Sequence, residues 1–70
     1  MYLELLVFDE DLEKEVFVPF TLEIEFVNGF YLDPADTNIV NLISYGQTYS
    51  VKKSHPLMAQ LQYKINWKEI

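Results

Sequence analysis

The chain contains no cysteine and no arginine, and it has only two glycines and one histidine. Without cysteine it can form neither a disulfide nor a thiolate metal site, which favours a cytosolic setting. Without arginine, and with a net charge of −6, it lacks the side chain best suited to gripping phosphates and base edges. Direct nucleic-acid binding is therefore disfavoured. Two glycines also leave no glycine-rich loop for cradling a phosphate.

Long apolar runs are missing as well. No stretch reaches the roughly 18 apolar residues that a membrane-spanning helix requires. The first residues, MYLELLVF, carry no positive charge and include Glu4, so they do not form the pattern of a signal peptide. We expect a soluble, cytoplasmic protein with no membrane partner.

Residues suited to catalysis are scarce. His55 is the sole histidine and stands before Pro56, which is typical of a turn. The serines lie in predicted strands or turns without a nucleophile-elbow glycine pattern; they are Ser44, Ser50 and Ser54. We therefore predict that the chain is not an enzyme and binds no cofactor.

One pattern of acidic residues matches a calcium-binding loop only in part. Asp9, Asp11 and Glu13 alternate as the first three ligands of a calcium loop do. The sixth position, which should be glycine for the sharp turn, is Lys14, and the twelfth, which should be a bidentate glutamate, is Phe20. We predict no metal site.

Alternation of apolar and polar residues predicts strands along most of the chain. Residues 2–8 form a nearly continuous apolar run, typical of a strand covered on both sides. Residues 16–27 alternate at period two, and Pro19 places this strand at a sheet edge or a bulge. Asn28-Gly29 predicts a type I′ hairpin turn before a short strand at 30–32. Residues 38–45 and 48–53 predict a second hairpin across Gly46-Gln47.

The last residues fit two patterns. Ser54-His55-Pro56 is able to begin a helix with Leu57, Met58, Leu61 and Ile65 on one side. Residues 60–68, QLQYKINWK, instead alternate without a miss, and we predict a strand there with at most one helical turn at 56–59. In that strand the apolar face and the polar face separate the rings from the lysines, which argues against a nucleic-acid stacking platform. The residues concerned are Leu61, Tyr63, Ile65 and Trp67 on one side, and Lys64 and Lys68 on the other.

The expected fold class is all-β. We predict one domain over 1–70, with five or six short antiparallel strands that form a barrel-like or sandwich-like sheet. The stretch VNGFYLDP…TYSVKKS also resembles the strand–strand–strand layout of small FlbD-type flagellar proteins, which end in a helix. That resemblance covers about half the chain and conflicts with the strand predicted for 60–68. No function is carried over from it.

Charge divides the chain into two halves. Residues 1–36 hold ten acids and one lysine (1 − 10 = −9), and residues 37–70 hold one acid and four lysines (4 − 1 = +3). The segment DEDLEKE at 9–15 supplies −4 of this charge and lies between two apolar strands. Its simplest interpretation is a solvated loop that keeps an aromatic-rich chain soluble.

A sharper interpretation is that the acids imitate a nucleic acid. We predict a small acidic protein-binding domain that engages a basic surface on a nucleic-acid-handling protein. In size, charge and lack of catalytic residues it resembles the small inhibitors of phages and mobile elements, anti-CRISPR proteins among them. The predicted contact residues are Asp9, Glu10, Asp11, Glu13, Glu15, Glu23 and Glu25.

Two alternatives stay open. The first is a structural module that self-assembles into a homo-oligomer through its edge strands and aromatic residues. In it the oppositely charged halves of two copies would meet head to tail. The second is a binder of small ligands, with its site in the mouth of a barrel.

Overall fold

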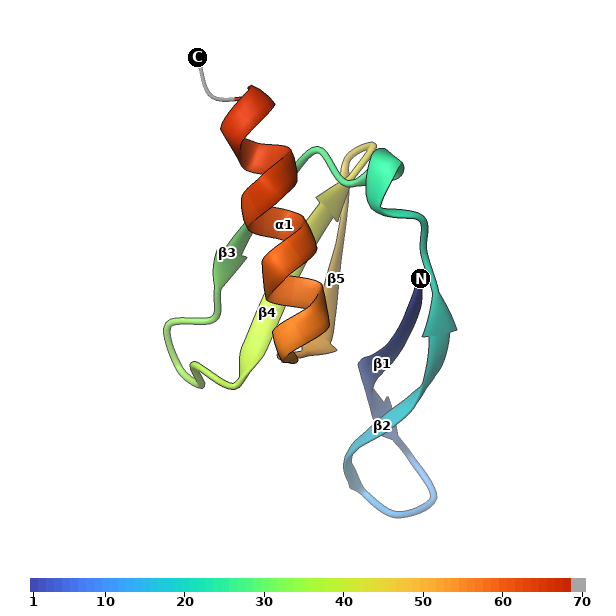
Figure 1. Ribbon diagram of the computed structural model, residues 1–70. Helices are drawn as coiled ribbons and strands as arrows, with labels where there is room; N and C mark the ends of the chain where they lie inside the picture. Colours follow the sequence, from blue (N-terminus) through green and yellow to red (C-terminus); the bar gives the residue numbers. More distant parts are fainter. Residues whose placement is uncertain (69–70) are drawn as a thin grey trace.

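The fold is one five-stranded antiparallel sheet with a helix across one face (Figure 1). The computed structural model describes the backbone of residues 1–68 and the side chains of residues 1–63. In chain order the elements are β1 (Tyr2–Asp9), β2 (Lys14–Thr21), the 3₁₀ turn η1 (Ile24–Phe26), β3 (Gly29–Leu32), β4 (Ile39–Ser44), β5 (Gln47–Lys52) and α1 (His55–Lys68). The strand order is β2-β1-β5-β4-β3. The all-β class with five antiparallel strands is confirmed, and α1 covers the sheet where a second sheet would otherwise lie.

The core lies between α1 and the central strands. Leu57 and Leu61 of α1 are buried and join Val40, Leu42 and Val51 in one apolar cluster. Burying a leucine side chain completely contributes about 1.5–3 kcal/mol to stability. Two further buried residues, Leu3 and Val27, complete the cluster.

The strand predicted for 60–68 is wrong, because residues 55–68 form α1. Ser54 caps this helix: its Oγ accepts the backbone N–H of Leu57 at 3.3 Å, and its carbonyl accepts that of Met58 at 3.0 Å. Leu57 and Leu61 fit either pattern, since residues four apart share a face of a helix and of a strand. Tyr63 separates the two patterns, because a strand would bury it beside Leu61 and it is 69% exposed. The faces predicted for residues 64–68 lie outside the described side chains.

The hairpin turn predicted at Asn28-Gly29 is also wrong. Gly29 already pairs with Ile43, and η1 joins β2 to β3 across opposite edges of the sheet. Asn28 instead holds the neighbouring turn: its N–H donates to the Ile43 carbonyl at 2.6 Å, and its Oδ1 accepts the Tyr45 N–H at 2.6 Å. The second predicted hairpin is confirmed, one position earlier than expected. Tyr45 (φ 50°) and Gly46 (φ 83°) are its two turn residues, both in the left-handed region that a type I′ turn requires.

The strand predicted for 16–27 is confirmed in its first part. β2 ends at Thr21 and is an edge strand, which is where Pro19 was expected. The period-two alternation of half-buried and exposed residues continues past the strand to Ile24 and breaks at the end of η1. There Phe26 is exposed and Val27 is buried.

Within the described residues, no helix has the length and apolar character needed to cross a membrane.

Truncating Leu61 to alanine tests the packing of α1. We expect Leu61→Ala to lower the free energy of unfolding by about 2–5 kcal/mol, because it leaves a cavity against the central strands. Gln62→Ala, at an exposed position of the same helix, should change it by less than about 0.5 kcal/mol. Urea unfolding followed by circular dichroism measures both, and equal effects would contradict the packing described.

The two glycines provide a matched test of the turn assignment. Gly46→Ala should cost about 1 kcal/mol, because the φ of +83° strains any residue with a Cβ although nothing lies within 4 Å of that atom. Gly29→Ala should cost almost nothing, since the added Cβ makes only an ordinary contact with Ile43 Cδ1 at 3.9 Å. Thermal unfolding of both variants checks this. A larger loss of stability from Gly29→Ala than from Gly46→Ala would contradict this assignment and support the turn predicted at Asn28-Gly29.

Candidate functional site

The segment of residues 9–15, called the acidic tip below, forms the turn between β1 and β2. Asp9 ends β1 and pairs across the ladder with Lys14, the first residue of β2. The Asp9 Oδ1 accepts the backbone N–H of Asp11 at 2.9 Å and that of Leu12 at 3.2 Å. Glu13 has a φ of 55°, which turns the chain back toward β2. One carboxylate of the acidic tip therefore holds the turn together rather than facing a partner.

The other four carboxylates face solvent. Glu10, Asp11, Glu13 and Glu15 are all exposed. Leu12 stands among them with 58% of its surface exposed. The hairpin projects away from α1, with the tip at its far end (Figure 1). The tip thus presents one apolar side chain surrounded by negative charge.

The remaining two predicted contact residues lie elsewhere. Glu23 is exposed and pairs with the amino group of Met1, its Oε2 lying 3.2 Å from the nitrogen. Glu25 lies exposed in η1. Met1 precedes β1 and Asp9 ends it, so a strand of eight residues separates the two groups by roughly 25 Å at ~3.3 Å per residue. The seven predicted residues therefore divide into five at the tip and two at the opposite end of β1.

The structure also places the residues of the calcium pattern and the single histidine, His55. An oxygen of Asp9 already accepts two backbone N–H groups of the loop. In the part of the chain that the structure describes, no three histidine, aspartate or glutamate side chains gather as a metal site requires. His55 is exposed and begins α1, so it belongs to the helix rather than to the turn before it.

Apolar side chains follow the tip along the hairpin, on the sheet face turned away from α1. Phe8 is 61% exposed and lies opposite Glu15 in the ladder; Phe17 is 40% exposed and lies opposite Leu6. The Lys52 amine sits 5.8 Å from the centre of the Phe17 ring. The expectation that residues 2–8 would be covered on both sides is wrong, because Leu3 is the one fully buried residue of β1.

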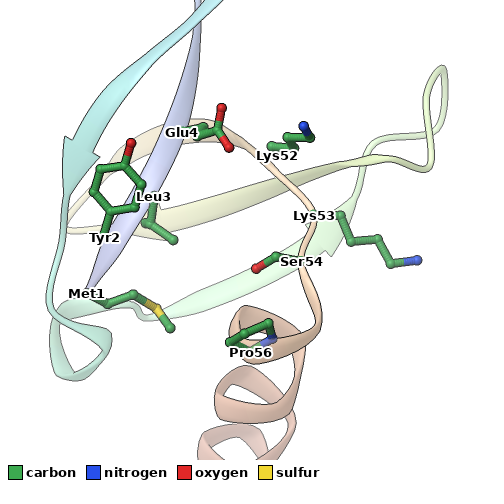
Figure 2. A pocket seen from close by; sticks show the side chains of 8 residues that line it. All are labelled: Met1, Tyr2, Leu3, Glu4, Lys52, Lys53, Ser54 and Pro56. Atoms are coloured by element: carbon green, nitrogen blue, oxygen red, sulfur yellow. The ribbon is translucent and has the colours of Figure 1, made fainter.

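A pocket of about 410 Å³ lies at the end of β1 opposite the tip. We call it the β1–α1 pocket, because the start of β1 and the connection into α1 line it (Figure 2). Its apolar lining includes Met1, Leu3 and Pro56, while Lys52 and Lys53 point outward at its edge. Tyr2, Glu4 and Ser54 complete the lining. A second hollow, also of about 410 Å³, shares Lys53 and Ser54 with it and continues along the start of α1.

Sequence reasoning assigned no role to Lys52 and Lys53. The only sign of these two lysines in the sequence was the charge of +3 carried by residues 37–70. The pocket itself was not predictable, because it forms where the connection into α1 lies beside the start of β1. Neither lysine forms an ion pair with any described side chain. The arrangement thus puts an acidic projection at one end of β1 and a cationic edge around an apolar pocket at the other.

Removing the Asp9 carboxylate tests its part in the turn. We expect Asp9→Ala to lower the free energy of unfolding by about 1 kcal/mol, since two backbone N–H groups lose their acceptor. Glu10→Ala, next in the chain and with an exposed side chain, should change it by less than about 0.5 kcal/mol. Denaturant titration of both variants provides the comparison, and equal losses would contradict the turn geometry.

Comparison with known proteins leaves the function to be argued from this geometry. No protein-family model, curated protein or solved structure matches the chain.

Proposed function

We propose that this chain is a small protein-binding domain that uses its acidic tip to engage a basic surface on a nucleic-acid-handling protein. The observation that carries the proposal is the projection of four exposed carboxylates around Leu12 at the end of the β1–β2 hairpin. A projecting loop is able to enter a groove, which a flat acidic surface is not. Clustered charge of one sign also speeds encounter with an oppositely charged partner.

Leu12 supports this function as much as the acids do. Rim charges on their own contribute mainly to the rate of association and to specificity. An apolar side chain that fills a pocket in the partner contributes more to affinity, because it leaves water completely. Leu12 is the one residue of the acidic tip able to do this.

The class of protein that fits best is an inhibitor or accessory factor of the phage or mobile-element kind. Such a factor needs no catalytic residue, because it acts by occupying the surface that a nucleic acid would use. The basic channel of an RNA-guided nuclease, which holds a guide–target duplex through its backbone, is a surface of the required charge. The proposal does not depend on Glu23 and Glu25, which lie at the other end of β1.

Two matched double variants test the proposal. Glu10→Gln with Glu13→Gln neutralises the tip, and Glu23→Gln with Glu25→Gln removes the same charge from the far end. We expect the wild-type chain to displace DNA from at least one member of a panel of purified RNA-guided nucleases. The tip variant should be weakened at least about tenfold, equivalent to ~1.4 kcal/mol, and the far-end variant less than about twofold.

Fluorescence anisotropy of labelled DNA measures the displacement, and repeating it at higher salt should weaken the wild-type chain as the Debye length falls from ~10 Å at 0.1 M to ~3 Å at 1 M. Equal weakening by the two double variants would refute a role for the tip. Failure to displace DNA from any nuclease of the panel would refute the inhibitor class.

A second candidate is a self-assembling β module. β2 and β3 are both edge strands, and large apolar side chains are exposed on or near them. Exposed edges and exposed rings are the features through which sheets pair between chains. The side chains concerned are Phe17, Phe26, Tyr31 and Leu32. Such pairing leaves the acidic tip free, so neutralising the tip would leave the oligomer intact.

A further inference from the structure

The β1–α1 pocket has an apolar floor and a cationic edge. Met1, Leu3 and Pro56 supply the apolar side chains. Lys53 and Lys52 supply two positive charges, although the Lys52 amine also sits 5.8 Å from the centre of the Phe17 ring, on the sheet face turned away from α1. Among the lining residues only Glu4 opposes these charges. The amino end of α1 opens beside the same edge and adds a partial positive charge. The pocket therefore suits an occupant with an apolar centre and carboxylates around it.

The acidic tip has that chemistry. Leu12 is 58% exposed, and exposed carboxylates lie next to it on both sides, at Asp11 and Glu13. A volume of about 410 Å³ has room for a leucine side chain, and the flanking carboxylates would then meet the lysines at the edge. Apolar burial and charge pairing thus act in the same contact.

A chain is unable to fill its own pocket with its own tip. The tip ends β1, whereas Leu3 and the rest of the pocket lie at its start, roughly 25 Å away along an eight-residue strand. A rigid antiparallel ladder with β2 keeps the two ends apart over the full strand. A tip that fills the pocket must therefore belong to another copy of the chain.

We propose that the β1–α1 pocket receives the acidic tip of a second copy of this chain. Leu12 of one copy inserts between Met1, Leu3 and Pro56 of the next, and the tip carboxylates pair with Lys52 and Lys53. Because the contact joins two different surfaces, the copy that gives its tip keeps its pocket free, and the other copy keeps its tip free. Repeating the contact produces an open chain or a ring.

Two variants, each blocking one side, test this contact with the purified chain alone. The tip variant carries Asp11→Asn and Leu12→Ser, and the pocket variant carries Lys52→Gln and Lys53→Gln. We expect sedimentation of the wild-type chain in low salt to show a mass that rises with concentration above the 8.3 kDa monomer and returns to it in high salt. A contact made by one loop is small, so the association should be weak and reversible.

Each variant alone should stay a monomer, whereas an equal mixture should form a two-chain complex and stop there. The mixture retains one intact tip and one intact pocket, so its association also proves that both variants are folded. Tyr45→Ser removes an exposed apolar side chain from the other hairpin turn and should associate as the wild-type chain does.

Three results would overturn the proposal. They are a wild-type chain that stays monomeric at every concentration in low salt, a mixture that stays monomeric, and association that persists in both variants. The last result would point to pairing of the edge strands. Because no basic partner protein is present, none of these results depends on whether the chain binds a nuclease.

Discussion

The packing of Leu57 and Leu61 against the central strands determines where the rest of the molecule lies. A sheet of five short strands has an apolar face that water would otherwise cover, and α1 is the one described element that covers it. Because α1 follows β5 after only two residues, docking the helix brings Ser54 and Pro56 beside the first residues of β1. The β1–α1 pocket is a direct result of that docking.

A second constraint explains why the hairpin projects. β1 pairs with β2 along its whole length, but it joins β5 through a single aligned pair, Leu5 with Val51. Beyond Leu5 the hairpin is therefore a two-stranded ribbon without a third strand beside it. Such ribbons twist strongly and expose both faces, which accounts for the exposure of Phe8 and for the distance of the acidic tip from the core.

Local patterns predicted strands well and their connections poorly. A nearly continuous apolar run located β1, the apolar–polar pattern located β2, β4 and β5, and the short strand expected at 30–32 is β3. The turn signal at Asn28-Gly29 failed, because the Asn28 side chain holds the turn at Tyr45, a contact between residues distant in sequence. Alternation failed at 60–68, where the uncovered sheet favoured a helix that leaves Tyr63 exposed. The position of the acidic tip was predictable from charge and its flanking strands, whereas the pocket at Lys53 required the helix to be placed first.

The two proposed contacts of the acidic tip exclude each other, since Leu12 is unable to fill a partner's groove and the pocket of another copy at the same time. Self-association would therefore compete with partner binding, and the apparent affinity for a partner would fall in proportion to the fraction of free tips. At low concentration, where contacts between copies dissociate, nearly every tip would be free. At high local concentration the tips would be occupied by the pockets of neighbouring copies. Only the tip at the end of an open chain would stay free to bind the basic partner protein. The acidic tip would then link the assembly state of the chain to its capacity to bind a basic surface.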